Sequence, residues 1–339
     1  MIPMKINWFY LNLPEKERER LARRYDRLVV TERYIDGAVT KLQALGRSSS
    51  RRVRIRERFV YRPQPAPGEV SDRRLPPLRD RPPSTRVLSP RGIALRFYLI
   101  ALCAAQIRTK GGRRPRNDLP LIAGGNETGW IDLIAVPVEA QHSGRFSASR
   151  SSKKQRQVIS ALRSLSDPSV QLVHLPNVSK RSGKYEGFQL CDEGGSRSDG
   201  EVPDYAVPTT TESCFDLPIG LFTNGWIHLL EDTELAFLMM IAHASQHINL
   251  GEQIKIESGL RLLHYGLGRD AYEAHKTLKA FGLLDVWIDE DRHDDGKVIN
   301  YGQGGQPRLH AFRLLPDGFD QPAADTIKKA FNGPSSGAT

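Results

Sequence analysis

Cysteine and long apolar runs are scarce in this sequence. The 339 residues include only three cysteines, and these form no CxxC pair and no cysteine–histidine pattern: Cys103, Cys191 and Cys214. This scarcity argues against structural zinc and favours a reducing cytosol. The longest apolar run, around 93–107, contains Arg96 and is shorter than a membrane span. The N-terminus lacks the layout of a signal peptide. We therefore expect a cytoplasmic protein with no membrane partner.

The signatures of common enzyme classes are also missing. The chain has no GxxxxGKS or GxxxxGKT phosphate loop and no GxSxG motif. His243 and His247 are four residues apart, but the intervening sequence lacks the glutamate of a zinc-protease helix. We therefore interpret them as ordinary histidines of a helix. The acidic loop near 291–302 has Gly302 where a calcium loop needs a bidentate acid. The sequence predicts a protein that is not an enzyme and holds no cofactor or metal.

Positive charge is concentrated in the first third of the chain. The net charge is +10 and the isoelectric point is about 9.6. Residues 1–118 hold 28 Lys and Arg against 11 Asp and Glu, a net charge of +17, whereas the remainder has a net charge of −7. Such a balance favours a polyanionic partner, most simply nucleic acid.

Residues 257–287 have the pattern of two helices, a tight turn and a strand. Gly266-Leu267-Gly268 breaks the first helix, and Asp270 is well placed to cap the second. Apolar residues of the second helix recur at three- and four-residue steps and share one face: Ala271, Ala274, Leu278 and Phe281. Its other face carries Arg269, Tyr272, Glu273, Lys276 and Lys279. This is a helix-turn-helix pattern.

The flanking sequence extends this pattern. A first helix is predicted over 233–246, and 283–287 and 307–318 are predicted strands on either side of the glycine-rich loop 288–306. A helix-turn-helix followed by a hairpin resembles a winged-helix domain. The alternative is a three-helix module with no role on DNA.

Residues 89–195 repeat the plan. An apolar helix is predicted over 91–107, followed by a loop with Arg113, Arg114 and Arg116. The helix predicted over 152–165 is the counterpart of the second helix above. Its outward face consists of Lys153, Lys154, Arg156, Gln157, Ser160 and Arg163. Two strands, 170–177 and 184–191, enclose a loop, which places Lys180, Arg181 and Lys184 on a wing tip.

The N-terminal part contains a helix and a basic segment. Leu21, Leu28, Ile35 and Leu42 recur every seven residues in a helix predicted over 14–45, which indicates a homodimer through residues 15–45 or a helix lying against a globular domain. In the segment that follows, arginines alternate with other residues at Arg52, Arg54, Arg56 and Arg58. These form either a strand with a cationic face or a flexible arm that follows phosphates. The competing interpretation is a basic solvated linker without a function.

These patterns define six segments. They are an N-terminal helix (1–46), a basic Pro/Arg-rich arm or linker (47–88), a first winged helix (89–195), a linker (196–216), a second winged helix (217–319) and a tail (320–339). We expect a mainly α fold with small β wings, in which two winged helices follow each other after an N-terminal helix. This arrangement resembles that of plasmid and phage replication initiators, over residues 89–319.

The resemblance implies sequence-specific binding of double-stranded DNA, by an initiator or by a transcriptional regulator associated with the nucleoid. The helix over 152–165 would lie in the major groove, the Lys180–Lys184 tip on the backbone, and Arg52, Arg54 and Arg56 would add electrostatic attraction. Residues 140–190 have a net charge of +7, whereas residues 191–339 have a net charge of −11. In the C-terminal domain, the exposed face with Arg269, Tyr272, Lys276 and Lys279 is also expected to contact DNA bases or phosphates. Because the acidic background of that domain repels DNA, it could instead bind a protein or pair with its own copy. The alternative for the whole chain is a winged-helix adaptor that docks other proteins.

Overall fold

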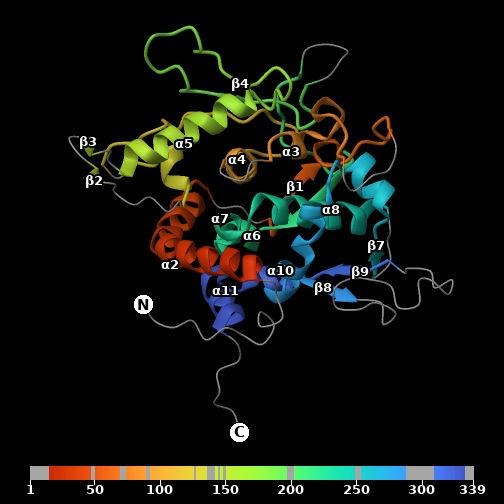
Figure 1. Ribbon diagram of the computed structural model, residues 1–339. Helices are drawn as coiled ribbons and strands as arrows, with labels where there is room; N and C mark the ends of the chain where they lie inside the picture. The colour runs from red at the N-terminus through yellow and green to blue at the C-terminus, as the bar shows by residue number, and fades with distance from the viewer. Residues whose placement is uncertain are drawn as a thin grey trace, which may run out of the picture.

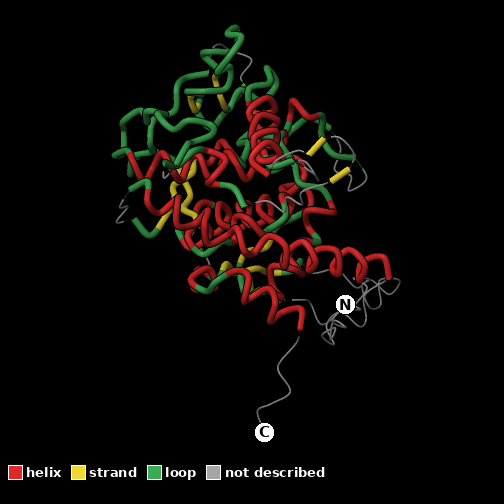
Figure 2. The backbone as a smooth tube through the Cα atoms, turned by 90° about the vertical axis from the view of Figure 1, so that its left-hand side faces the viewer, coloured by secondary structure: helices red, strands yellow, loops and turns green. Residues whose placement is uncertain are grey.

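The computed structural model is about half helical and carries small sheets of two or three strands (Figures 1 and 2). It describes residues 15–46, 50–68, 74–88, 92–125, 127–135, 142–143, 146–147, 150–196, 202–248, 253–287 and 309–332. The predicted mainly α fold with small β elements is confirmed at this level.

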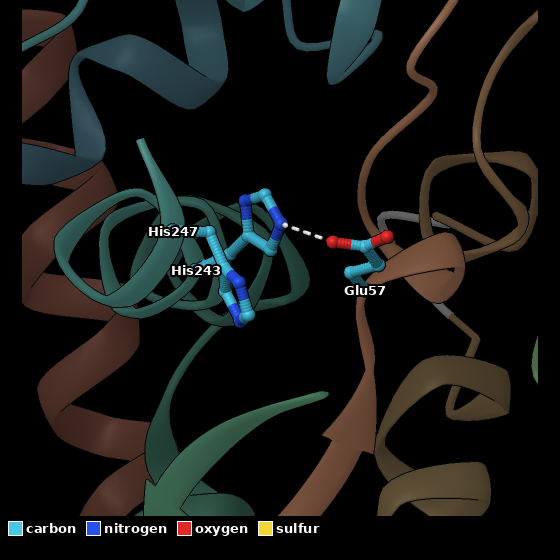
Figure 3. Close-up of side chains that lie close together, drawn as sticks. All are labelled: Glu57, His243 and His247. Atoms are coloured by element: carbon cyan, nitrogen blue, oxygen red, sulfur yellow. Dashed lines mark ion pairs between the residues drawn. The ribbon is translucent and has the colours of Figure 1, made fainter. Parts of the chain in front are cut away.

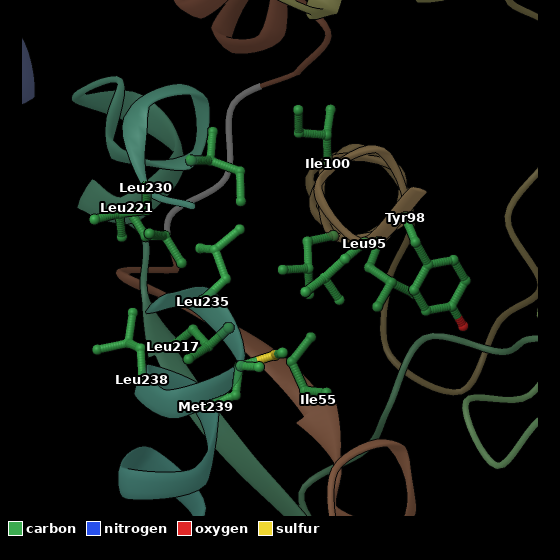
Figure 4. Packing of buried hydrophobic residues seen from close by; sticks show 14 of the residues in the cluster. Ile55, Leu95, Tyr98, Ile100, Leu217, Leu221, Leu230, Leu235, Leu238 and Met239 are labelled. Carbon is green, nitrogen blue, oxygen red and sulfur yellow. The ribbon is translucent and has the colours of Figure 1, made fainter. Parts of the chain in front are cut away.

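Two apolar helices form the centre of the molecule. α4 (Ala94–Arg108) and α8 (Asp232–His247) are buried over most of their length. A helix that is apolar on nearly all sides must be enclosed by other elements. Figure 4 shows Leu95 and Ile100 of α4 on one side of this core, with Leu235 and Leu238 of α8 across from them. The predicted helices over 91–107 and 233–246 are therefore confirmed.

A two-stranded ribbon joins the N-terminal segment to this core. β1 (Arg52–Arg56) pairs antiparallel with β6 (Cys214–Pro218), with Arg54 opposite Asp216. Val53 and Ile55 are fully buried on the inner side of β1. Residues 52–56 thus form a strand, which is one of the two forms predicted for the alternating arginines. The other elements in the described ranges 50–68 and 74–88 are η1 (Glu57–Phe59), η2 (Leu78–Asp80) and α3 (Pro83–Arg86).

The long N-terminal helix packs along the body of the molecule. α2 (Glu15–Ala44) confirms the helix predicted over 14–45. Its seven-residue repeat is buried within the chain, at Leu21, Leu28, Ile35 and Leu42. The repeat contacts other parts of the same chain, as expected for a helix lying against a globular body. A homodimer through residues 15–45 would have to use other positions of the helix and stays a prediction.

The central unit follows α4. It comprises η3 (Trp130–Leu133), the short strands β2 (His142–Ser143) and β3 (Phe146–Ser147), and α5 (Arg150–Leu165), which packs on α4. β4 (Val173–His174) and β5 (Gln189–Leu190) then pair antiparallel. The predicted helix and hairpin are thus present, although each strand is only two residues long.

The C-terminal unit contains the only three-stranded sheet in the part of the chain that the structure describes. β7 (Ile254–Lys255), β8 (Leu284–Trp287) and β9 (Ala311–Leu314) lie in the order β7-β9-β8. Before the sheet come α6 (Gly220–Thr223) and α7 (Trp226–Leu229). After it come η6 (Pro316–Asp320) and α11 (Ala323–Asn332), which packs on α2. The loop predicted as the second wing lies in 288–308, outside the described residues.

The predicted helix-turn-helix is present in a modified form. Its first helix is a single π-helical turn, η4 (Leu260–His264), and its second helix is divided at Glu273 into α9 (Arg269–Tyr272) and α10 (Ala274–Ala280). Gly266 has a φ of +66°, which a glycine adopts without strain. The turn therefore lies where the sequence predicted it.

The two halves of the chain share one core. A single cluster of buried apolar residues extends from Leu21 to Phe331 and includes residues of α2, α4, α5 and α8. The predicted linker over 196–216 contributes to it through Tyr205 and Val207, which are 1% and 6% exposed. The described part of the predicted linker is therefore part of the common core. Of the helices within the described ranges, none is long and apolar enough to cross a membrane.

Candidate nucleic-acid interface

Helix α5 has one apolar face and one polar face. Its buried residues recur at three- and four-residue steps: Val158, Ala161, Leu162 and Leu165. The opposite positions point away from α4, because side chains three or four residues apart share a face. Arg156, Ser160 and Arg163 are exposed there. The helix predicted over 152–165 and the outward direction of these three side chains are confirmed.

Three other predicted residues of α5 are half-buried. They are Lys153, Lys154 and Gln157. Lys154 Nζ donates a hydrogen bond to the Ile131 carbonyl of η3 at 3.4 Å, and Gln157 Oε1 is buried without a hydrogen-bond partner. Lys154 is thus directed toward η3, and the outward surface of α5 is smaller than the sequence indicated.

The β4–β5 hairpin carries a cationic tip beside α5. Lys180, Arg181 and Lys184 are all exposed on the loop between the two strands. The loop is ordered by backbone hydrogen bonds, among them Lys180 N to the Asn177 carbonyl at 2.9 Å. Arg163 Nε donates to Tyr185 Oη at 2.6 Å, and this contact ties α5 to the hairpin. The cations of the helix and of the loop therefore belong to one surface, which we call the α5 surface.

A second loop extends the α5 surface. Arg113 and Arg116 are exposed, and Arg114 forms an ion pair with Asp204 at 2.6 Å. Asn117 Nδ2 donates to the Phe188 carbonyl at 2.8 Å, which holds this loop against the hairpin.

The structure places the arginines of β1 differently from the prediction. Arg56 is wrong as a nucleic-acid contact, because its side chain is 6% exposed and forms ion pairs with Glu193 and Glu212. Burial alone would lower the pKa of Arg56, but these carboxylates raise it above its usual value, so the guanidinium stays charged. Arg52 and Arg54 both pair with Asp216, at 3.2 and 3.5 Å. The cationic side of β1 is thus largely neutralised within the chain.

The predicted residues of the C-terminal unit do not form one cationic face. Lys276 pairs with Glu273 at 2.6 Å, and Lys279 Nζ donates to the Val286 carbonyl at 3.1 Å. Tyr272 is half-buried and contacts the rings of Phe237 and Phe312, so it is a packing residue. Arg269 is exposed at the start of α9.

A cluster of three polar side chains, which was not predicted from the sequence, lies away from the α5 surface. Glu57, His243 and His247 each offer one ligand atom, and these atoms lie within 4.8 Å of one another (Figure 3). The four-residue spacing of the histidines was visible in the sequence. The carboxylate was not, because Glu57 reaches them only through the pairing of β1 with β6.

Comparison of this chain with protein-family models, with curated proteins and with solved structures finds no match. The geometry of the chain itself is therefore the basis for assigning its function.

Proposed function

We propose that this chain binds double-stranded DNA, with α5 in the major groove and the loop of the β4–β5 hairpin on the phosphate backbone. The observation that carries the proposal is the α5 surface, where exposed cations of a helix and of a neighbouring loop point to solvent together. The segment over 140–190 holds nine Lys and Arg against Asp167 and Glu186, a net charge of +7. Phosphate neutralisation with counterion release is the main source of affinity for DNA.

The order of elements supports two winged helices in tandem as the framework of this proposal. In the C-terminal unit a helix, a strand, a turn between two helical segments and two further strands follow one another, and β9 lies between β7 and β8. In the central unit, α4, η3, α5 and the β4–β5 hairpin follow a shorter version of the same order. Such an arrangement resembles that of plasmid and phage replication initiators, and a transcriptional regulator of the same build is an equal candidate.

A winged-helix adaptor for another protein is the second candidate. The observation that favours it is the net charge of −11 over residues 191–339, which repels DNA. The acidic C-terminal unit would then be the docking surface. On this alternative the α5 surface would have no measurable affinity for nucleic acid at low salt.

A charge-reversal pair tests the proposal. The double variant Arg156→Glu/Lys184→Glu changes the α5 surface on both the helix and the hairpin. We expect its affinity for duplex DNA to fall by more than about 10-fold, because two phosphate contacts are replaced by repulsion. The measurement is fluorescence anisotropy with a labelled duplex at 50 mM and at 200 mM salt.

The matched control is a double variant with the same change in net charge at two residues outside the α5 surface. Arg18 and Lys329 are exposed and lie outside the α5 surface, on α2 and α11. The variant Arg18→Glu/Lys329→Glu should keep most of the affinity. Equal losses in the two variants would mean that only the net charge matters, and the placement of DNA on α5 would then be wrong.

A further inference from the structure

Three side chains from distant parts of the sequence converge at one end of α8. Glu57 begins η1 directly after β1, and His243 and His247 lie one turn apart on α8. Figure 3 shows Glu57 facing His243, with the His247 ring beside it. The two histidine rings are stacked, with ring centroids 4.9 Å apart. The cluster exists because the pairing of β1 with β6 places Glu57 next to the last turns of α8.

One nitrogen of the cluster is buried without a hydrogen bond. His243 is 1% exposed, and its Nε2 has no hydrogen-bond partner in the structure. The nearest carboxylate oxygen is Glu57 Oε2 at 3.7 Å, which is too far for a hydrogen bond. Nearly all buried polar atoms in proteins have a partner, and an exception requires a reason, such as an ion that binds there.

Two of the three remaining ring nitrogens are held by other groups. His243 Nδ1 is 2.8 Å from Tyr265 Oη, and His247 Nε2 is 2.7 Å from the Cys214 carbonyl oxygen. A carbonyl only accepts, so His247 Nε2 carries the hydrogen and Nδ1 keeps its lone pair. With the hydrogen of His243 on Nδ1, donated to Tyr265, its Nε2 lone pair points to Glu57. A hydrogen bond from the other ring nitrogen is the usual support of a metal-binding histidine.

We propose that Glu57, His243 and His247 bind a zinc ion. Two imidazole nitrogens and one carboxylate oxygen form a ligand set that zinc uses when a fourth position is left open to water. Calcium and magnesium prefer sites made only of oxygen, and zinc binds more tightly than ferrous iron to the same nitrogen and oxygen ligands. This inference does not depend on the proposed DNA binding.

The surroundings allow an ion to enter. His247 is exposed and the Glu57 side chain is 32% exposed, so the site opens to solvent on one side while His243 forms its buried base. Zinc lies about 2.0–2.2 Å from such ligands, so the three ligand atoms must approach one another by roughly 1 Å or more on binding. The His247 side chain is exposed and the Glu57 side chain is half-buried, so these two have room to shift toward His243, which is fixed by Tyr265.

Zinc would cross-link two segments of the fold. It would connect the segment after β1 to α8, and thus join residues that the chain separates by 186 positions (243 − 57). A ligand that binds the folded state alone stabilises it, by an amount that grows with the logarithm of its concentration relative to its Kd.

The test uses the full-length chain, freed of metal by a chelator and dialysed. Zinc is titrated in competition with a chromophoric chelator, and cobalt(II) is added in a parallel experiment as a spectroscopic probe of the coordination geometry. We expect one zinc ion per chain, visible absorption bands typical of four-coordinate cobalt, and a rise in the melting temperature with zinc.

Substitution of the two solvent-accessible ligands, Glu57 and His247, tests the assignment of the ligand set. Glu57→Gln and His247→Ala should each weaken zinc binding by more than about 10-fold and abolish the rise in melting temperature, while the circular dichroism without metal stays unchanged. His174→Ala, which removes an exposed histidine on β4, is the matched control and should bind zinc like the parent. Parent-like zinc binding by both ligand variants, or no zinc binding by the parent at micromolar concentration, would overturn the assignment.

Discussion

Buried ion pairs connect the N-terminal segments of this chain to its core. Arg24 of α2 and Glu234 of α8 form a two-pronged pair, with Nη1 2.5 Å from Oε1 and Nη2 2.7 Å from Oε2. Their side chains are 7% and 3% exposed. Because neither charge reaches solvent, each depends on the other for its stabilisation.

Removal of Arg24 alone should be strongly destabilising. In Arg24→Met, Glu234 is left as a buried carboxylate without its partner, and we expect the free energy of unfolding to fall by about 3–5 kcal/mol. Urea denaturation measures this loss. The double variant Arg24→Met/Glu234→Leu should recover part of the lost free energy of unfolding, because no unpaired charge is left buried. The recovery is incomplete, since Glu234 no longer accepts the hydrogen bond from Glu231 N. A loss below about 1 kcal/mol in the single variant would contradict the burial of the pair.

A buried histidine makes the stability of the chain depend on pH. Burial, together with the charges of Arg96 and Lys154, lowers the pKa of His228 to about 3. The unfolded chain has the usual value near 6.5, so below that pH it binds a proton that the folded chain does not. The stabilising contribution of neutral His228 is therefore complete above pH 6.5 and is lost as the pH falls toward 3.

The size of this effect is measurable between pH 7 and pH 5. The contribution of His228 to the free energy of unfolding should fall by about 2 kcal/mol over that interval. His228→Gln carries no such titration, so its stability should depend less on pH by this amount in urea denaturation at the two values. Identical pH dependence of the parent and the variant would mean that His228 is already charged in the folded protein.

At the scale of elements, the turn before α9 depends on Gly266. A Cβ at this position would lie 2.9 Å from Thr85 Oγ1 and 3.0 Å from Arg81 Cβ, in addition to the strain of its positive φ. Gly282 has a similar φ of +69°, but nothing lies within 4 Å of its Cβ position. A substitution at Gly282 thus causes backbone strain alone, whereas one at Gly266 causes backbone strain and steric crowding.

Alanine at these two positions should have unequal effects. Gly282→Ala should lower the free energy of unfolding by about 1–2 kcal/mol, which is the cost of a left-handed conformation for a residue with a Cβ. Gly266→Ala should lower it further, since α3 must also move. Thermal or urea denaturation of both variants gives the comparison. Equal losses would show that Thr85 and Arg81 yield without cost.

The helices could be predicted from the sequence because each has a recognisable apolar pattern. α5 and α2 lie where a three- and four-residue spacing and a seven-residue repeat indicated them, and α4 and α8 coincide with the predicted apolar helices, to within a few residues. The division of the last predicted helix at Glu273 could not be predicted, because α9 and α10 pack separately on α8. The outward side of α5 followed from the same spacing, but the inward direction of Lys154 depends on η3, which contacts α5 only in the folded chain.

The arginines of β1 illustrate what the sequence could not reveal. Their alternation with apolar residues predicted a strand with a cationic face as one of two possibilities. The carboxylates that neutralise this face come from 192–216, more than a hundred residues further along the chain. The same long-range pairing brings Glu57 to the two histidines of α8, so the zinc cluster was equally hidden.

At the scale of the whole molecule, the shared core makes the central unit dependent on the rest. α4 packs against α5 on one side. On its other side lie α7, α8 and β1, and Figure 4 shows Leu95 of α4 facing Leu235 of α8 and Ile55 of β1. A fragment of residues 89–195 would expose the second side of α4 to water. We expect this fragment to lack a cooperative thermal transition and a near-ultraviolet circular dichroism signal, whereas the whole chain should show both. A fragment with a sharp transition would mean that the central unit folds alone.

The β1–β6 ribbon affects how the chain folds during its synthesis on the ribosome. β1 ends at Arg56 and β6 begins at Cys214, so β1 emerges well over a hundred residues before the strand that completes it. At a synthesis rate of about 5–20 residues per second, this interval lasts roughly ten to thirty seconds. Throughout it, the backbone of β1 lacks its pairing strand, and Val53 and Ile55 are covered only in part, by α4. Nascent chains are therefore vulnerable to aggregation at this strand, and a chaperone that shields extended apolar segments would act there first.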